Sequence, residues 1–153
     1  MTEDLQLTDL DRWILSELHA LIATVTIYLD SYNPTDAARK IQEFVNMLSN
    51  WYVRRNRRRF WKSENDSDKS AAYFTLYTVL MDFVKVMAPV IPFVCEKIYA
   101  NLVVPMKGEV FDSVHLCDFP IVNTSLTDEN ILKEVDTIIQ IVSLSRAARN
   151  KAN

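Results

Sequence analysis

Glycine is almost missing from this sequence, and its scarcity removes several kinds of binding site. The 153 residues contain a single glycine, Gly108. Neither a GxGxxG dinucleotide-binding turn nor a Walker A phosphate loop can be written with one glycine, so nucleotide binding through a glycine-rich loop is excluded. A turn-rich β protein is also disfavoured, because its tight turns draw on glycine. Long helices are favoured instead.

Cysteine and histidine are scarce as well, with two of each. Cys95 and Cys117 are far apart and form no CxxC pair, which indicates reduced thiols in an intracellular protein. With only His19 and His115 beside them, we expect no metal site. No paired carboxylates and no nucleophile–base set stand out, so we expect no catalytic residue in this chain.

The sequence has no signal for export or membrane insertion. The N-terminal stretch MTEDLQLTDLD is acidic and polar, unlike a signal peptide. No apolar run approaches the roughly 18 residues of a membrane span. We therefore expect a cytoplasmic protein that does not enter a membrane. A hydrophobic content of 49% and a charged content of 24% are typical of one folded domain of this length.

Apolar residues recur at helical spacing through most of the chain and predict an all-α bundle of about five helices. We place the helices at 9–30, 35–62, 69–87, 93–103 and from about 130 to the end of the sequence. Thr8 or Asp9 caps the first helix, and Asn33 and Pro34 begin the second. In the third helix we expect Phe74 among the inward residues.

Two segments break the helical pattern. Residues 104–126 are expected to be irregular or extended, with a short alternating piece at 114–116. The last helix turns basic in RAARNKAN and stops without a capping signal. We therefore expect that 1–153 is one helical domain of a longer protein, cut short at its C-terminal end.

Positive charge is concentrated in one stretch, NWYVRRNRRRFWKS at 50–63. Within it, residues 54–62 include six basic residues and no acidic one, although the chain has a formal net charge of −3. The other residues carry 11 basic and 20 acidic groups. A basic cluster on an acidic body indicates a specific electrostatic site rather than general attraction to polyanions.

Helical periodicity divides this cluster into two groups. A turn of about 100° per residue from the core position Leu48 places Arg55 and Arg59 near the core face. We expect their stems to pack and their guanidinium groups to pair with acids of a neighbouring helix. The outward face holds Asn50, Arg54, Arg57, Arg58 and Trp61. The two other tryptophans, Trp13 and Trp51, are expected in the core.

The outward arginines repel one another unless an anion binds. Guanidinium groups hold phosphate through paired hydrogen bonds and stack on bases, and an exposed tryptophan offers a stacking plane. This combination is typical of proteins that bind unpaired RNA loops. A membrane-binding or calmodulin-target helix also mixes arginine with aromatic residues, but both favour a free amphipathic helix. Here the basic stretch continues directly from a core stripe.

Five motifs occur in an order that a known family shares: LDRWILSEL, LSNWYVRRNRRRFW, MAPVIPFVCEKIYANL, SVHLCDFP and RAARNKAN. Together they resemble the anticodon-binding domain of isoleucyl-tRNA synthetase, a class I enzyme, over nearly the whole chain. The arginine-rich helix and SVHLCDFP favour the isoleucine enzyme over its valine and leucine relatives, which stay open as alternatives.

The resemblance implies a domain that docks on the anticodon stem-loop of tRNA-Ile within an enzyme that uses ATP and Mg to attach isoleucine to tRNA. Neither the HIGH-like nor the KMSKS-like motif of the adenylation site occurs here, so the resemblance implies a non-catalytic part without a cofactor of its own. Its partners would be tRNA-Ile and the remainder of the synthetase.

The resemblance also implies which residues face the tRNA. At the end of the second helix they are Asn50, Arg54, Arg57, Arg58, Trp61 and Lys62. On the first helix the additions are Asp11, Arg12, Ser16 and His19. For His19, a surface position without a role is the simpler interpretation. A helical module whose arginines bind an acidic protein partner remains the alternative function.

Overall fold

The computed structural model describes residues 6–62, 66–103 and 111–152. Within these ranges the α-helices are α1 (Asp9–Asp30), α2 (Pro34–Met47), α3 (Arg57–Lys62), α4 (Asp66–Met87), α5 (Pro92–Val103) and α6 (Glu129–Ala152). A π-helical segment, η1 (Leu48–Val53), follows α2. The 3-10 turns η2 (Val114–Leu116) and η3 (Thr124–Leu126) precede α6. No described residue is in a β-strand, which confirms the all-α prediction.

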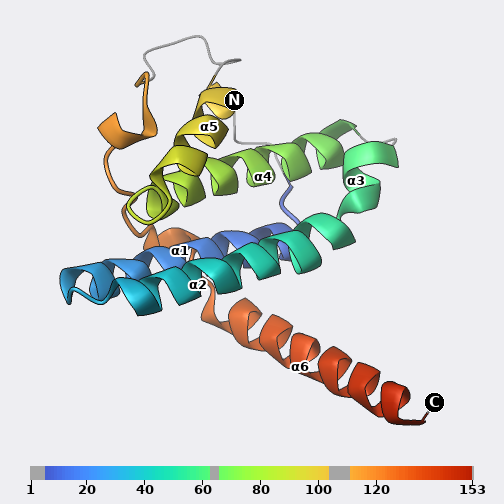
Figure 1. Cartoon of the computed structure of the whole chain (residues 1–153). Coiled ribbons are helices and arrows are strands. Elements are labelled where there is room, and N and C mark those ends of the chain that lie inside the picture. Colours follow the sequence, from blue (N-terminus) through green and yellow to red (C-terminus); the bar gives the residue numbers. More distant parts are fainter. Residues whose placement is uncertain (1–5, 63–65, 104–110, 153) are drawn as a thin grey trace.

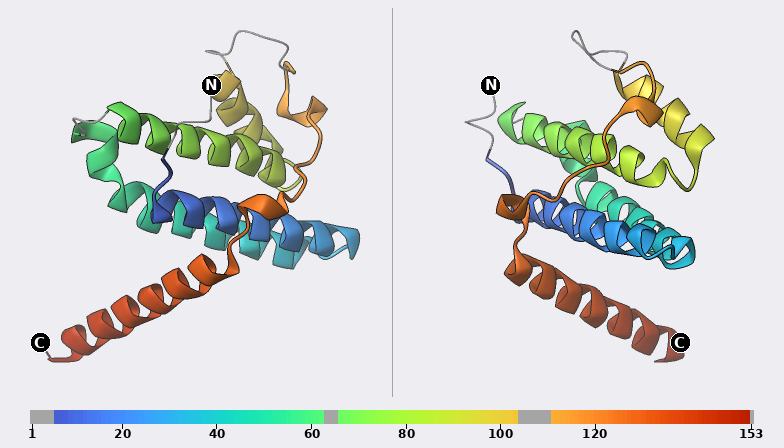
Figure 2. Two further views of the ribbon diagram at one scale, coloured as in Figure 1. Left: turned by 180° about the vertical axis from the view of Figure 1, so that it is seen from behind. Right: turned by 90° about the vertical axis from the view of Figure 1, so that its left-hand side faces the viewer.

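The helices form two packed layers and one projecting helix (Figure 1). The antiparallel pair α1 and α2 forms one layer, and α4 and α5 form the other. At one end of the bundle, α3 carries the chain from the first layer to the second. From the far side of the first layer, α6 runs away from the bundle, so that its C-terminal half projects beyond it (Figure 2).

The core lies between the two layers and is built largely from α1. Its largest fully buried side chains include Trp13, Ile14 and Leu18 of α1, Phe44 of α2 and Tyr99 of α5. The burial of Trp13 confirms its expected place in the core. By length and mean hydropathy alone, α1 is apolar enough to cross a membrane, but half of its most apolar window is buried inside the bundle. That burial is the behaviour of a core helix.

Local capping explains where the first two helices begin. The hydroxyl of Thr8 accepts a hydrogen bond from the Asp11 N–H, and the Asp11 carboxylate accepts one from the Thr8 N–H at 2.9 Å. This reciprocal capping box satisfies two of the N–H groups that a helix start leaves unpaired. At α2 the Asn33 side chain accepts from the Asp36 N–H, and Pro34 occupies the first turn. The predicted starts of both helices are confirmed.

Two details of the predicted core and loops are wrong. Phe74 is 41% exposed, because the buried face of the first half of α4 consists of Ala71, Ala72, Thr75 and Val79. Residues 114–116 form a 3-10 turn, not an extended piece, because the Ser113 hydroxyl accepts a hydrogen bond from the His115 N–H and caps the turn. The predicted irregular segment also includes residues 104–110, which lie outside the described ranges.

The connection to α6 is anchored on α1 through a buried hydroxyl. Ser16 Oγ lies 2.9 Å from the carbonyl oxygen of Leu126 and accepts a hydrogen bond from the Asp128 N–H at 3.1 Å. Asp128 in turn caps α6, because its carboxylate accepts from the N–H of Asn130 at 3.0 Å. The origin of the projecting helix is therefore held against the core helix.

Substitution of Ser16 by alanine leaves the buried Asp128 N–H and Leu126 carbonyl without a partner from α1. We expect Ser16→Ala to lower the free energy of unfolding by about 1–3 kcal/mol. Urea denaturation followed by circular dichroism measures this change. The exposed Ser125 bonds only within its own turn, so Ser125→Ala is the matched control and should change stability by less than about 0.5 kcal/mol. Equal effects of the two variants would contradict the anchoring role.

Candidate nucleic-acid interface

The predicted second helix is interrupted in the middle of its arginine-rich stretch. After the π-helical segment η1, the chain turns at Asn56, whose carbonyl oxygen accepts from the Arg59 N–H at 2.9 Å at the start of α3. Each residue of a π-helix turns by less than the 100° of an α-helix, so the side chains after η1 point in directions that a continuous α-helix does not give. The arginines therefore form two groups. Arg54 and Arg55 follow η1 directly, and residues 57–59 belong to α3.

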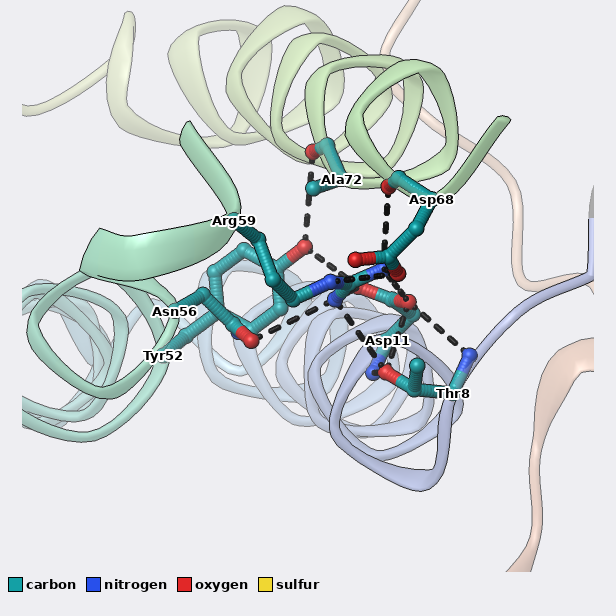
Figure 3. Close-up of polar contacts among 7 residues, drawn as sticks. All are labelled: Thr8, Asp11, Tyr52, Asn56, Arg59, Asp68 and Ala72. Carbon is teal, nitrogen blue, oxygen red and sulfur yellow. Dashed lines mark hydrogen bonds and ion pairs between the residues drawn. The ribbon is translucent and has the colours of Figure 1, made fainter. Parts of the chain in front are cut away.

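One arginine of the stretch, Arg59, is locked inside the molecule (Figure 3). Its guanidinium donates to both carboxylate oxygens of Asp11 at 2.9 Å. Its Nε donates to Asp68 of α4 at 2.8 Å. The hydroxyl of Tyr52 donates to the same Asp11 carboxylate at 2.6 Å. These bonds join α1, η1, α3 and α4, and they confirm that Arg59 pairs with acids of neighbouring helices.

The pair is charged on both sides. Burial raises the pKa of Asp11, but hydrogen bonds from Arg59, Tyr52 and Thr8 outweigh it and hold that pKa below its ordinary value. Burial likewise opposes the charge of Arg59, but its bonds to Asp11 and Asp68 raise the pKa of the guanidinium. Burial and the neighbouring Asp11 both raise the pKa of Tyr52, so its hydroxyl stays a donor.

Three predicted first-helix site residues are not part of the surface. Asp11 and Ser16 are fully buried, and His19 is 5% exposed. Asp11 neutralises Arg59, Ser16 holds the connection to α6, and His19 Nδ1 accepts from the Asn123 N–H at 3.3 Å. Burial lowers the pKa of His19, with a smaller opposing effect of Asp82. The prediction that these three face a ligand is wrong, because each is buried and bonds to another part of the chain. His19 is not a surface residue either.

The fourth first-helix candidate, Arg12, is exposed and forms a surface ion pair. Its guanidinium lies 2.6 Å from the Asp9 carboxylate, one turn away on α1. An exposed pair of this kind is weak and can open to bind another anion. Arg12 therefore stays among the surface residues, with part of its charge already matched.

The outward residues of the arginine-rich stretch are exposed, as the sequence predicts. They are Asn50, Arg54, Arg57, Arg58 and Trp61. The Trp61 ring is 71% exposed, and the Arg57 guanidinium carbon lies 5.7 Å from its centroid. Among the described residues, Arg54, Arg57 and Arg58 have no ion pair with a carboxylate. The side chain of the last candidate, Lys62, lies outside the described part of the structure.

Arg55 lies on the surface, which corrects its expected place in the core. Its guanidinium carbon lies 5.3 Å from the ring centroid of Trp51. Trp51 is only partly buried, so one part of its ring packs on the core and the rest is accessible. The prediction assumed a turn of about 100° per residue from Leu48 to Arg55. The π-helical segment turns by less per residue, so the Arg55 side chain points in another direction.

A cleft of about 560 Å³ separates Arg54 and Arg55 from α6. Its lining includes Asn50, Trp51, Arg54 and Arg55 on one side and Val142 and Arg146 of α6 on the other. Arg146 was not among the predicted site residues. The basic turn at the end of the sequence was its only signal, and periodicity alone does not show that α6 passes beside η1.

The described residues contain no group of three or more His, Cys, Asp or Glu side chains that could hold a metal ion.

The sequence model of one family, described as the anticodon-binding domain of tRNA ligase, matches residues 11–153. The chain belongs to this anticodon-binding domain family. The relatives of this anticodon-binding domain include the isoleucine–tRNA ligase of Dehalococcoides mccartyi strain ATCC BAA-2266, 51% identical over 147 residues, which are 96% of this chain and 14% of the relative. The isoleucine–tRNA ligase of Clostridium novyi is 51% identical over 94% of this chain and 14% of its own length.

A more distant relative is the isoleucine–tRNA ligase of Thermus thermophilus, which is 44% identical over 145 residues, or 94% of this chain and 14% of its own length. The anticodon-binding domain thus spans about one seventh of the curated relatives that it matches. As a member of a tRNA-ligase domain family, it is a tRNA-binding module. The exposed, unpaired arginines around Trp61 and in the α6 cleft are its candidate contacts with RNA.

Loss of the buried carboxylate tests the network that positions α3. We expect Asp11→Asn to lower the free energy of unfolding at pH 7 by about 3 kcal/mol, because it removes the buried one of the two carboxylates that neutralise Arg59. The pKa of Asp11 is lowered by folding, so its stabilisation is present above the unfolded-state pKa of about 3.9 and is lost as the pH falls toward the folded-state pKa.

Denaturation of the wild type and of Asp11→Asn between pH 7 and pH 2 measures both effects. The stability difference should be largest at neutral pH and should shrink below about pH 4. Asp9→Asn, which breaks only an exposed pair on the same helix, is the control and should cost less than about 1 kcal/mol. A stability difference that does not change with pH would contradict the charged pair.

Proposed function

We propose that this domain recognises the anticodon stem-loop of tRNA-Ile as part of an isoleucine–tRNA ligase. The observation that carries the proposal is the set of exposed arginines without described counter-charges, placed beside an exposed tryptophan on an acidic chain. Such a surface attracts a polyphosphate and offers stacking planes to unpaired bases. The identity of the tRNA rests on the relatives, which are isoleucine–tRNA ligases.

In this proposal the chain performs recognition and the remainder of the ligase performs the chemistry. The whole enzyme would use ATP and Mg to attach isoleucine to its tRNA in the cytoplasm, and residues 1–153 would hold the tRNA without entering a membrane. Because the acceptor end would bind elsewhere on the enzyme, the domain alone would bind tRNA more weakly than the whole ligase does.

The surface residues would bind different parts of the RNA, according to the chemistry of their side chains. Arg57 and Arg58 neutralise phosphates of the stem-loop, which supplies affinity and salt dependence. Trp61, with Arg57 beside its ring, offers a plane on which an unpaired base stacks. The Asn50 amide can both donate to and accept from a base edge. Arg12 adds a weaker phosphate contact, since it must first leave Asp9.

A second candidate function is a helical interaction module whose arginines bind an acidic protein partner. Competition separates the two functions. If RNA shape and bases matter, an acidic peptide should displace labelled anticodon stem-loop weakly at equal charge, and stem-loops of tRNA-Val and tRNA-Leu should bind less tightly than that of tRNA-Ile. Full displacement by the peptide would favour the protein partner.

The phosphate contacts predict a defined salt dependence. We expect Arg57→Ala and Arg58→Ala each to weaken binding of tRNA-Ile and to flatten the slope of log K against log salt by about 0.7–0.9. Fluorescence anisotropy of labelled tRNA at several salt concentrations measures the slope. Arg39→Ala removes one exposed arginine from α2 and should leave the slope unchanged. Unchanged slopes for both test variants would reject the phosphate contacts.

The stacking plane predicts an effect on affinity without an effect on folding. We expect Trp61→Ala to weaken binding of the stem-loop by about 1–3 kcal/mol, because a base loses its aromatic partner. Thermal unfolding should stay close to that of the wild type, since the ring is 71% exposed. Trp61→Phe keeps an aromatic plane and should recover most of the affinity. Equal affinities of the alanine variant and the wild type would remove Trp61 from the interface.

A further inference from the structure

The cleft between η1 and α6 differs in charge from the other described cavities. Three guanidinium groups, those of Arg54, Arg55 and Arg146, line it, and no carboxylate does. Three other described cavities, of about 180, 190 and 300 Å³, are each lined by at least one carboxylate. Among the described residues, none of the three cleft guanidinium groups has a hydrogen bond or an ion pair. The cleft is therefore positively charged and free to accept an anion.

The volume of the cleft suits a single small ligand. Pockets that hold one small molecule measure about 300–1,000 Å³, and the cleft measures about 560 Å³. A helical hairpin or an extended peptide needs a long groove instead, whereas the lining of this cleft is confined to residues 50–55 and one turn of α6. A single nucleotide fits both the volume and the charge.

The cleft also contains a stacking plane that a simple phosphate site does not need. Arg55 lies over the Trp51 ring at 5.3 Å, and Trp51 packs on the core through its other parts. The Arg55 guanidinium is a planar, charged group beside an aromatic ring, and its residue is exposed. Arginine planes stack on unpaired bases in RNA recognition.

We propose that this cleft takes one unpaired nucleotide of an RNA loop, whose phosphate is held by Arg54 and Arg146 and whose base stacks on the Arg55 guanidinium. The Asn50 amide, which lines the same cleft, is placed to bond the base edge. This inference rests on the proposed RNA-binding function and deepens it, because it separates a nucleotide cleft at η1 and α6 from the phosphate surface of α3.

Two substitutions test the two halves of the cleft. Arg55→Lys keeps the positive charge but removes the planar group, so it should weaken binding of the anticodon stem-loop about fivefold with an unchanged salt slope. Arg146→Ala should weaken binding about fivefold and flatten the slope by about 0.7. Neither variant should weaken binding of a plain duplex of the stem sequence, which has no unpaired nucleotide.

Matched controls come from exposed arginines outside the cleft. Arg39→Lys makes the same exchange on α2, and Arg149→Ala makes the same exchange one turn further along α6, outside the cleft lining. Both should change stem-loop affinity by less than about twofold. Anisotropy with labelled stem-loop and labelled duplex gives the affinities, and circular dichroism verifies the fold of each variant.

The outcomes separate the cleft from the general function. Selective loss of stem-loop binding in Arg55→Lys and Arg146→Ala supports the cleft. If the wild type binds the stem-loop but both variants behave like their controls, the cleft is overturned and the α3 surface stands. If the test variants lose duplex binding to the same extent, the cleft is a plain phosphate site and the nucleotide proposal is overturned. If the wild type binds no RNA, both proposals fail.

Discussion

The carboxylate of Asp11 is fully buried where α1, α3 and α4 meet, and its charge is matched by Arg59. A buried pair of this kind adds little net stability, but removal of one partner is costly because the other charge is left without compensation. The pair therefore permits only one placement of α3. Since Arg57, Arg58 and Trp61 share that short helix with Arg59, the same pair sets the direction in which they leave the bundle.

Neighbouring arginines of one stretch thus serve opposite purposes. Arg59 is 14% exposed and surrounded by Asp11 and Asp68, whereas Arg58, one position earlier, is exposed. Among the described residues, no carboxylate pairs with the outward arginines, whereas Asp36 pairs with Arg39 and Glu43 with Lys40. The surface charge of the arginine-rich stretch is consequently left for a ligand. A polyphosphate chain supplies many negative charges at regular spacing and is a natural counterpart.

The spacing of apolar residues was sufficient to predict helix bounds and burial wherever a helix is α-helical throughout. It predicted α1 over its whole length, the Asn33–Pro34 start of α2 and the burial of Trp13. The pairing of Arg59 was also predicted correctly, although Arg59 lies in α3, beyond the π-helical segment. Periodicity failed at Arg55, because a π-helical segment has no reliable sequence signature and changes the phase of every residue after it. The family resemblance, not periodicity, suggested that Asp11, Ser16 and His19 face a ligand, and the structure buries all three. Polar residues on a buried stripe are understood only when their partners are known. Those partners lie more than 40 positions away, in η1, α3 and the connection to α6.

The projection of α6 is a tertiary feature that no local pattern predicts. Its apolar spacing suggests a core helix, yet Ile131 is its one buried residue within the described range, and Ile138, Ile141 and Leu144 are exposed. Arg146 of α6 lines the same cleft as the arginines that follow η1. The proposed nucleotide site thus combines two basic segments that are about 90 positions apart in sequence.

The central claim is that the unpaired guanidinium groups of α3 and of the α6 cleft await an RNA ligand. The most direct test is NMR shift mapping of this chain with an anticodon stem-loop of tRNA-Ile at two salt concentrations. The account predicts shifts concentrated at residues 50–61 and 142–146 that decrease at the higher salt concentration. Shifts confined to α4 and α5, or shifts that do not respond to salt, would contradict it.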